Sequence, residues 1–262
     1  MKIKFDKYQG TGNDFILMDN RENSYDNMTT EQVKAMCSRH FGIGADGLML
    51  LNKKENFDFE MIYFNADGNK GSMCGNGGRC IVQFAYSLGI KKKEYLFSAT
   101  DGAHRAEIDL DKEVSIKMNN VAAVKFSLDY YTLNTGSPHY VQFVKEVEKM
   151  DVVTGGRKIR YNKEFTKEGI NVNFVEVLGD DKIFVRTYER GVEDETLSCG
   201  TGVTASALVA AHNDNGFNRV EVKTKGGNLS VEFEKKSETE FENIWLCGPA
   251  SFVFSGEIDI KD

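Results

Sequence analysis

The chain has only two prolines and one tryptophan among its 262 residues. No stretch approaches the roughly 18 uninterrupted apolar residues that a membrane helix needs, and the opening segment lacks the apolar core of a signal peptide. Together with 25 glycines, the scarcity of proline predicts many tight turns and few rigid linkers. We therefore expect a cytoplasmic globular protein without a membrane partner.

Basic charge is also in short supply. The chain carries 33 Lys and Arg against 40 Asp and Glu, which gives a net charge of −7. Proteins that bind nucleic acids carry a basic stripe. The one basic cluster here, residues 91–93, is followed at once by Glu94 and predicts a solvated turn. No nucleic-acid partner is expected.

The five cysteines do not form a recognisable framework. Their number is odd and their spacing irregular, which favours reduced cytosolic thiols over disulfides. No pair has the two-residue gap of a zinc ribbon, so no metal is expected. For Cys37, Cys80 and Cys247 we predict packing roles alone.

Strand patterns dominate the chain, because apolar and polar residues alternate with β-branched and aromatic enrichment. The clearest are residues 15–18, 48–51, 58–64, 114–118, 172–177 and 229–233. Helical patterns are fewer, and each is bounded by a capping or terminating residue. They run from Thr30 as N-cap towards His40, from after Gly77 to a stop at Gly89, and from after Gly202 to near Gly216.

Three landmarks recur in the two halves of the chain in nearly constant register. Residues 11–13 (Thr-Gly-Asn) match 135–137 (Thr-Gly-Ser), and 74–77 (Cys-Gly-Asn-Gly) match 199–202 (Cys-Gly-Thr-Gly). The separation from Asn13 to Cys74 is 61 positions, and that from Ser137 to Cys199 is 62. The pairs Gly42-Ile43 and Gly169-Ile170 fall between, 32 and 30 positions before their cysteines. The repeat predicts two homologous halves of about 125 residues, one domain each.

Each Cys-Gly-x-Gly turn ends a strand-like stretch and opens a helix of small residues. Cys74 and Cys199 are therefore expected at helix N-termini, where unpaired N–H groups and the macrodipole favour negative charge. The pKa of each thiol should fall below its usual value of about 8.5. One such turn alone would favour a strand-to-helix connection with a buried thiol, whereas two in register favour chemistry.

If the two halves pack about a pseudo-twofold axis, the two cysteines face each other across one cleft. A carboxylate bound by both helix ends would then have its α-carbon between the sulfurs. One thiolate could remove the α-proton while the other thiol delivers a proton to the opposite face. Oriented N–H donors would stabilise the charge that develops on the carboxylate. The pattern predicts an amino-acid racemase or epimerase.

The same residues resemble a known family. Residues 65–68 (Asn-Ala-Asp-Gly) with 73–80 (Met-Cys-Gly-Asn-Gly-Gly-Arg-Cys) look like the first signature of the diaminopimelate epimerases. Residues 188–191 (Tyr-Glu-Arg-Gly) with 196–202 (Thr-Leu-Ser-Cys-Gly-Thr-Gly) look like the second, and 8–15 are similar to the family's opening. The likeness covers nearly the whole chain.

The resemblance implies an α/β fold of the α+β type with two pseudo-symmetric domains. Each domain would be a β-barrel-like sheet around a central helix, with the active site in the cleft between the domains. Because the last strand returns to the first domain in that family, the domains would be residues 1–121 with 250–262, and residues 122–249.

The resemblance also implies an isomerase that interconverts LL- and meso-2,6-diaminopimelate, for lysine and peptidoglycan precursor synthesis. No cofactor is expected, neither pyridoxal phosphate nor metal, and relatives are often homodimers. Cys74 and Cys199 would be the base and acid. The implied substrate-binding residues are Gly75, Asn76, Gly200 and Thr201 at the reacting carboxylate, Asn13 nearby, and Asn65, Asn171, Glu189 and Arg190 at the distant end. That end is a zwitterion, which an acid and a guanidinium can match.

Two positions depart from the family pattern. Many relatives have Gly-Asn-Pro-His-Cys where this chain has Gly-Ser-Pro-His-Tyr at 136–140, so Ser137 replaces an amide that contacts the ligand. Gly47 stands where some relatives have Gln, which removes another contact. His139 could orient neighbouring groups or be a structural histidine, and both interpretations remain open.

Dinucleotide binding is an alternative, because residues 200–205 fit the pattern G-x-G-x-x-A before a helix. However, only 57 residues follow Ala205, and they are mostly strand-like. Residues 42–47 also match, but they follow a helix and precede a strand, the wrong order for a phosphate turn.

Three further alternatives concern the thiols. Two cysteines of low pKa could form a redox-sensing disulfide, in which case oxidation would join Cys74 to Cys199 and stop turnover. A proline racemase-like enzyme shares the two-thiol logic but has no need of Glu189 and Arg190. A hydrolase built on Cys199 and His139 would leave Cys74 and the repeat unexplained.

Overall fold

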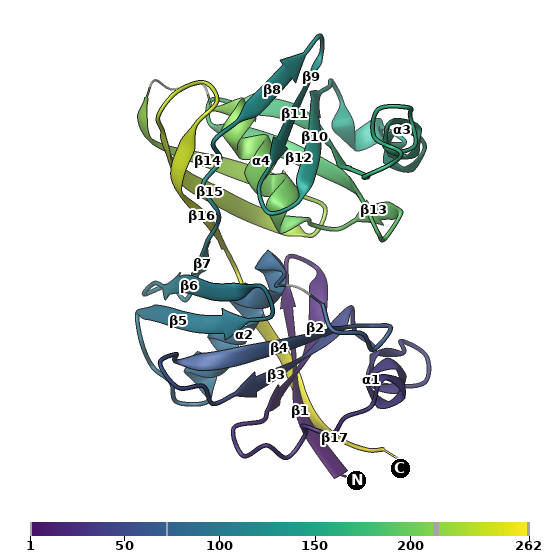
Figure 1. Ribbon diagram of the computed structural model, residues 1–262, viewed down its shortest axis with the longest axis vertical. Helices are drawn as coiled ribbons and strands as arrows, with labels where there is room; N and C mark the ends of the chain where they lie inside the picture. The colour runs from purple at the N-terminus through teal and green to yellow at the C-terminus, as the bar shows by residue number, and fades with distance from the viewer. Residues whose placement is uncertain (1, 72, 212–214, 261–262) are drawn as a thin grey trace. The chain divides into compact units, whose positions relative to one another are not determined.

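The computed structural model describes residues 2–71, 73–211 and 215–260. The chain divides into two compact units (Figure 1), which we call unit 1 (Met1–Ile116 with Pro249–Asp262) and unit 2 (Lys117–Gly248). Unit 1 contains β1 (Lys2–Gly10), β2 (Asn13–Asp19), α1 (Thr30–Cys37), β3 (Gly47–Asn52), β4 (Phe59–Asn65), α2 (Gly75–Ser87), β5 (Glu94–Ala99), β6 (Gly102–Ile108), β7 (Val114–Lys117) and the returning β17 (Ser251–Asp259).

Unit 2 is built from a similar series of elements. They are β8 (Val124–Ser127), β9 (Tyr130–Asn134), β10 (Pro138–Phe143), the 3-10 turn η1 (Val147–Lys149), α3 (Val152–Arg160), β11 (Asn171–Gly179), β12 (Lys182–Glu189), β13 (Asp194–Thr196), α4 (Gly200–Ala210), β14 (Gly216–Thr224), β15 (Gly227–Lys235) and β16 (Phe241–Gly248).

The two sheets repeat one topology. In unit 1 the strand order is β17-β1-β2-β3-β4-β5-β6-β7, with β2–β3 and β4–β5 parallel and the other pairs antiparallel. In unit 2 it is β8-β9-β10-β11-β12-β14-β15-β16, with β10–β11 and β12–β14 parallel. Helices α1 and α3 connect the first parallel pair of each sheet, and α2 and α4 precede the last strand of the second pair. The repeat seen in the sequence is therefore a repeat of structure.

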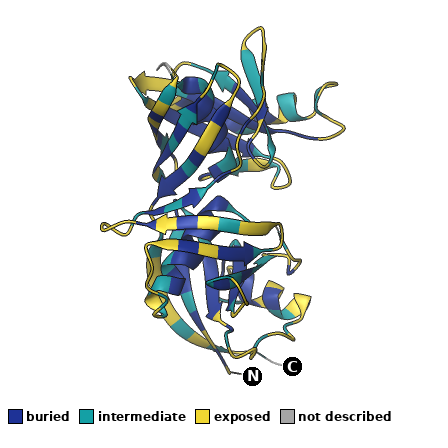
Figure 2. Cartoon of the chain, turned by 60° about the vertical axis from the view of Figure 1, so that its left-hand side comes forward, coloured by how far each residue is buried: buried dark blue, intermediate teal, exposed yellow. Residues whose placement is uncertain are grey.

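Each sheet curves around its long helix without closing. Helix α2 contacts β1, β2, β3 and β6, and α4 contacts the strands from β9 to β12 and from β14 to β16. Both helices are buried over most of their length, as Figure 2 shows. Among the described residues, no strand pairing joins β17 to β7 or β8 to β16 within a unit. The barrel-like sheets expected from the resemblance are thus open sheets, and the central helices are confirmed.

The predicted strands are all confirmed, but the helix boundaries need correction. Helix α1 is capped by Thr29 rather than Thr30, because Thr29 forms a capping box with Gln32, and it ends at Cys37 before reaching His40. Helices α2 and α4 begin three residues earlier than expected, at Gly75 and Gly200. Gly89 ends α2 as predicted, with a φ of 93°. Helix α4 ends at Ala210, and residues 212–214 of its predicted end lie outside the described residues.

Helix α3 was not expected, since Gly155 and Gly156 interrupt its pattern. A Cβ atom at Gly156 would lie 2.3 Å from Cβ of Tyr188, so the close packing of α3 on β12 requires glycine there. Asp151 caps the helix by accepting the N–H of Thr154 at 3.0 Å. Tertiary packing therefore decides the structure of this segment against its intrinsic propensity.

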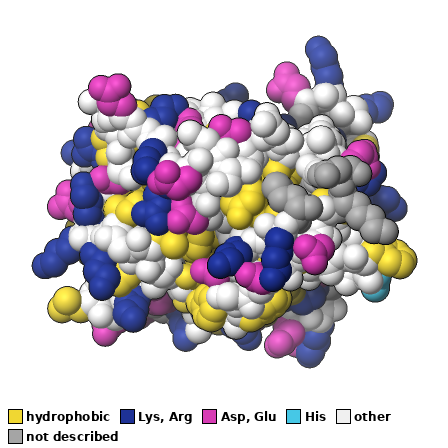
Figure 3. Space-filling model, turned by 90° about the horizontal axis from the view of Figure 1, so that it is seen from below, with side chains coloured by type: hydrophobic (Ala, Val, Ile, Leu, Met, Phe, Trp, Pro, Cys, Tyr) yellow, Lys and Arg dark blue, Asp and Glu magenta, His cyan; other side chains and the backbone are white. Residues whose placement is uncertain are grey.

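The surface carries charges of both signs. On the face seen in Figure 3, basic and acidic side chains alternate and do not gather into a single basic stripe. Within the described parts of the chain, no helix is long and apolar enough to cross a membrane.

Candidate active site

Both signature cysteines are helix N-caps in the same backbone conformation. Cys74 has φ −108° and ψ 133°, and Cys199 has φ −112° and ψ 109°. The carbonyl of Cys74 accepts the N–H of Gly78 at 2.7 Å, and that of Cys199 accepts the N–H of Val203 at 2.8 Å. Neither sulfur caps its helix by accepting a main-chain N–H of the first turn. The positive end of each helix dipole is therefore next to a thiol.

The thiol of Cys74 faces an amide. Its Sγ lies 3.6 Å from Oδ1 of Asn13, and the same oxygen accepts from Nδ2 of Asn76 at 3.4 Å. The guanidinium of Arg79, which is 0 % exposed, donates to Oδ1 of Asn76 at 3.0 Å and to the carbonyl of Gly75 at 3.3 Å. The start of α2 and the turn before β2 are thus joined by side-chain hydrogen bonds around Cys74.

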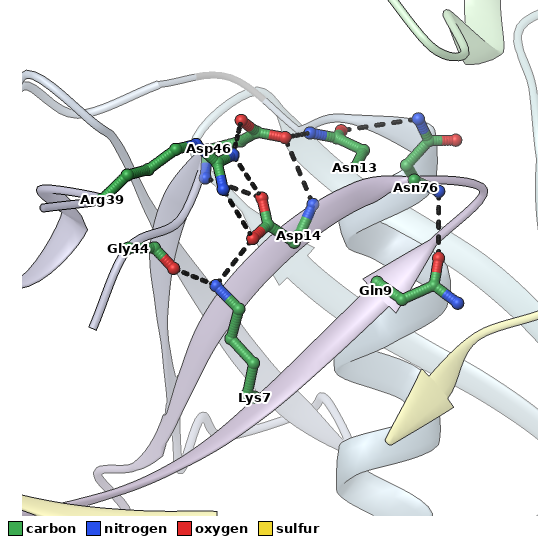
Figure 4. Close-up of polar contacts among 9 residues, drawn as sticks. Lys7, Gln9, Asn13, Asp14, Arg39, Gly44, Asp46 and Asn76 are labelled. Atoms are coloured by element: carbon green, nitrogen blue, oxygen red, sulfur yellow. Dashed lines mark hydrogen bonds and ion pairs between the residues drawn. The ribbon is translucent and has the colours of Figure 1, made fainter. Parts of the chain in front are cut away.

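A network of charged side chains lies on the other side of Asn13 (Figure 4). Asp46, in the loop before β3, accepts from Nδ2 of Asn13 at 2.5 Å. Arg39 donates to Asp46 at 2.6 Å and to both oxygens of Asp14, at 2.7 and 3.1 Å. The ammonium of Lys7, only 5 % exposed as a residue, lies 2.8 Å from Asp14. We call Lys7, Asp14, Arg39 and Asp46 the charge network.

The charge network holds Asp14 as a carboxylate. Burial alone would raise the pKa of Asp14, but the hydrogen bonds and charges of Arg39 and Lys7 outweigh it and lower the pKa to about 2. The pKa of Arg39 is raised, mainly by its hydrogen bonds to Asp14. Two cations balance two carboxylates, so the network carries little net charge beside Cys74.

Cys199 has a hydroxyl as neighbour where Cys74 has an amide. Its Sγ lies 3.5 Å from Oγ1 of Thr201, and either atom can donate. The side chain of Thr135, in the turn between β9 and β10, donates to the carbonyl of Thr201 at 2.8 Å. Cys199 is 8 % exposed, whereas Cys74 is half-buried.

The other cysteines are buried thiols. Burial raises the pKa of Cys37 to about 11 and that of Cys80 to about 12, so both keep their protons at neutral pH. Cys247 is also buried.

A polar cluster in unit 2 joins residues from three strand ends. Nδ2 of Asn171 donates to Oγ of Ser137 at 2.9 Å, and the guanidinium of Arg190 lies 3.4 Å from the same hydroxyl. Arg190 also donates to the carbonyl of Glu168 at 3.0 Å. The neighbouring Glu189 accepts from Oγ1 of Thr196 at 3.0 Å. Ser137 therefore contacts Asn171 and Arg190, two residues of the expected distal site.

His139 belongs to a buried network that supports α4. It is 0 % exposed, and its Nδ1 accepts from Nδ2 of Asn173 at 3.1 Å. Burial, followed by the charge of Arg190, lowers its pKa to about 3, so the ring is neutral at pH 7. Asn173 also accepts from Thr187 at 2.9 Å and lies against Gly202 in the first turn of α4. A neutral histidine held there fits the structural interpretation.

Asn65, an expected substrate-binding residue, and Gly47, a departure from the family pattern, lie on neighbouring strands of unit 1. Asn65 is exposed at the end of β4, where its main-chain N–H bonds the carbonyl of Asn69 at 2.9 Å. At Gly47, a Cβ atom would lie 2.4 Å from the ring of Tyr63. A side chain at position 47 would therefore collide with Tyr63 as it is placed here.

Solved structures share this fold. A phenazine biosynthesis protein of the PhzF family from Bacillus anthracis has a TM-score of 0.74 at 16 % identity, covering 99 % of this chain and 100 % of its own. A hydroxyproline epimerase from Agrobacterium vitis has a TM-score of 0.70 at 12 % identity, covering 100 % and 93 %. The fold is therefore the two-unit, pseudo-symmetric α+β fold that also serves an amino-acid epimerase.

Sequence relationships identify the family within this fold. The family described as diaminopimelate epimerase matches residues 5–124 and 131–253. A diaminopimelate epimerase of Flavobacterium psychrophilum is 48 % identical over 257 residues, covering 98 % of this chain and 100 % of its own length. That of Chlorobaculum tepidum is 44 % identical over 261 residues, covering 96 % and 99 %. The chain belongs to the diaminopimelate epimerase family of isomerases.

Sequence reasoning missed the residues that hold the expected site residues in place. These are Lys7, Arg39, Asp46, Arg79, Asn173 and Thr196. Arg79 lies within the first signature and Asp46 within the Gly42–Gly47 turn. Their position in a motif was the one feature of the sequence that could have indicated a role near the site. A fully buried arginine has to be paired, but burial at a single position is not readable from the chain alone.

Proposed function

We propose that this enzyme interconverts LL- and meso-2,6-diaminopimelate by proton transfer between Cys74 and Cys199. The observation that carries the proposal is the equivalent placement of the two thiols, each as the extended N-cap of the central helix of its own unit. Membership of the diaminopimelate epimerase family supports the substrate.

The proposed reaction needs one thiolate and one thiol. The thiolate takes the proton from the α-carbon, and charge develops on the adjacent carboxylate. The N–H groups at the starts of α2 and α4, around Gly75, Asn76, Gly200 and Thr201, would bind that carboxylate and stabilise its charge. The thiol then gives its proton to the opposite face of the carbon, which leaves the pair with its roles exchanged. Asn13 would act beside Cys74.

The distal end of the substrate would be bound by the polar cluster of unit 2. Arg190 can form charge-assisted hydrogen bonds with the distal carboxylate, and Glu189 can accept from the distal ammonium. Asn171 and Asn65 would add amide contacts, and Ser137 contributes a hydroxyl within 2.9 Å of Asn171. We propose that residues 1–121 with 250–262 form one domain of the enzyme, and residues 122–249 the other.

The proposed chemistry sets its own cellular requirements. Both proton carriers are side chains of this chain, so the reaction needs neither pyridoxal phosphate nor a metal. Both thiols must stay reduced, which suits the cytoplasm and the synthesis of lysine and peptidoglycan precursors. We expect the enzyme to act as a homodimer, as relatives often do.

Isotope exchange tests the two-thiol mechanism. LL-diaminopimelate is incubated with the reduced enzyme in D₂O, and both epimers are recovered at early times. Deuterium is expected in the new epimer well before the recovered substrate, because each face has its own proton carrier. Early labelling of the recovered substrate would instead indicate a single base.

Variants of the two cysteines provide the second test. Cys74→Ala and Cys199→Ala should each lower kcat by about 10³-fold or more, because each removes one proton carrier. Cys37→Ala is the matched control, since its buried thiol has no part in the proposal. Full activity of either Cys74→Ala or Cys199→Ala, with circular dichroism showing a folded protein, would contradict it.

A further inference from the structure

The amides of Asn13 and Asn76 form a chain between two groups, Asp46 and Arg79, that each hydrogen-bond in one sense only. At one end, the carboxylate of Asp46 can only accept. The 2.5 Å contact with Asp46 must therefore be made by the NH₂ group of Asn13. The oxygen of that amide is then directed away from Asp46 (Figure 4).

Arg79, at the other end of this chain of amides, favours the same orientation of the Asn13 side chain. Arg79 can only donate, so the 3.0 Å contact with Asn76 must be made to the oxygen of Asn76. The NH₂ group of Asn76 is left to donate to Asn13 at 3.4 Å. The direction of donation runs from Arg79 through Asn76 and Asn13 to Asp46, and the oxygen of Asn13 lies 3.6 Å from Sγ of Cys74.

Asp46 is itself firmly held. One of its oxygens accepts from Arg39 at 2.6 Å, and the other accepts the main-chain N–H of Asp14 at 3.2 Å. Arg39 in turn bonds both oxygens of Asp14, which Lys7 also contacts. A carboxylate anchored by so many partners gives the Asn13 amide little freedom to turn over.

We infer that Asp46 is a positioning residue of the proposed epimerase site, which keeps the oxygen of Asn13 toward Cys74 and so keeps the proton on that thiol in the substrate-free enzyme. An amide oxygen accepts from S–H, whereas an amide N–H in its place would stabilise the thiolate. Because the proposed pair holds one proton, the thiolate then falls on Cys199, whose neighbour Thr201 has a hydroxyl that can donate. This inference rests on the proposed function for its meaning in catalysis.

Alkylation of Cys74 as a function of pH tests the orientation directly. The full-length protein without substrate is treated with iodoacetamide between about pH 6 and 10, where a thiol titrates, and alkylated peptides are quantified by mass spectrometry. In Asp46→Ala only the long 3.4 Å contact from Asn76 still opposes a turn of the Asn13 amide, in place of the 2.5 Å bond to Asp46. Asn13 can then turn its NH₂ group to the sulfur, so the midpoint for Cys74 should fall by about one pH unit. We expect kcat to fall about tenfold, because the proton is then carried by the wrong sulfur.

The conservative variant Asp46→Asn separates orientation from charge. Its carbonyl oxygen can still accept from Asn13, and Arg39, whose side chain is 56 % exposed, can turn to solvent while it keeps Asp14. Asp46→Asn removes the same charge as Asp46→Ala, yet its midpoint for Cys74 and its kcat should stay close to those of the wild type. Equal shifts in both variants, or no shift in Asp46→Ala, would overturn the inference.

Controls exclude other origins of a shift. In Asp46→Ala the midpoint for Cys199 should rise as that for Cys74 falls, because the proposed pair holds one proton. Asp19→Ala, which breaks another Asp–Arg pair of unit 1, should leave both midpoints unchanged. Two of the titratable groups around Cys74 have a pKa outside the pH range scanned, which is near 2 for Asp14 and near 12 for Cys80. The other charged groups there are Lys7, Arg39 and Arg79.

Two further measurements keep the outcome clear. Asp46 is in a loop and its side chain is 40 % exposed, so its replacement should be tolerated; Asp46→Ser repeats the test if Asp46→Ala is unstable. Loss of the proposed function would appear as activity retained in Cys74→Ala. The alkylation midpoint of Cys74 decides on Asp46 independently of that result.

Discussion

The side-chain oxygen of Asn171 accepts the main-chain N–H of Arg190 at 2.8 Å. This contact ties the start of β11 to the residue that follows β12. Since the Asn171 amide also bonds Ser137, one side chain fixes the position of both neighbours. The orientation of the Arg190 guanidinium is thus set by the backbone as well as by its own contacts.

Arg190→Lys should therefore weaken substrate binding more than chemistry. Lysine keeps the charge but loses the planar pair of donors that matches a carboxylate. We expect KM for LL-diaminopimelate to rise about tenfold or more, with a smaller change in kcat. Initial rates over a range of substrate concentrations measure both. Arg219→Lys, at an exposed ion pair on β14, is the matched control. A fall in kcat at constant KM would place Arg190 outside substrate binding.

Thr201→Val should make the Cys199 thiolate harder to form. The hydroxyl 3.5 Å from Sγ can donate to a thiolate, and valine has the same shape without that donor. The alkylation midpoint of Cys199 should rise by about half a pH unit or more, while Thr201→Ser should retain the wild-type value. Thr204→Val is the control, because its hydroxyl bonds the carbonyl of Gly200 instead. An unchanged midpoint in Thr201→Val would show that the hydroxyl does not act on the sulfur.

Asp14 should make stability depend on pH in acid. The pKa of Asp14 in the folded protein, about 2, is below its ordinary value of 3.8. The stabilising effect of the Asp14 carboxylate is therefore complete above pH 3.8 and is lost as the pH falls through about 2. Asp14→Asn should lower the free energy of unfolding by about 1–2 kcal/mol at pH 7. That difference from the wild type should shrink toward zero near pH 2. Urea unfolding at several pH values measures it, and a difference independent of pH would be inconsistent with this assignment.

Gly156→Ala should destabilise unit 2 by about 2 kcal/mol, because the new methyl group collides with Tyr188 in a packed interior. Gly179→Ala is the matched control: a Cβ atom there meets nothing within 4 Å. Thermal unfolding of the two variants compares them. Equal melting temperatures would mean that α3 can move away from β12 without cost.

Local pattern in the sequence was sufficient for much of this structure. The alternation of residues such as 229–233 predicted strands, and the Cys-Gly-x-Gly turns placed both cysteines at helix starts. Helix α3 escaped prediction because its glycines are required by Tyr188, a contact distant in sequence. The charge network was not predicted for the same reason, because β1, β2 and the segment between α1 and β3 each supply part of it. The residue pattern within one segment does not indicate which residues of other segments it will contact.

The pairing of β17 with β1 makes unit 1 a discontinuous unit, whereas unit 2 is one uninterrupted segment. During synthesis, the second unit has all its strands available before the first receives its edge strand. The half of the enzyme that contains Cys74 thus completes its sheet only when residues 251–259 have left the ribosome, so the order of maturation is the reverse of the order of translation.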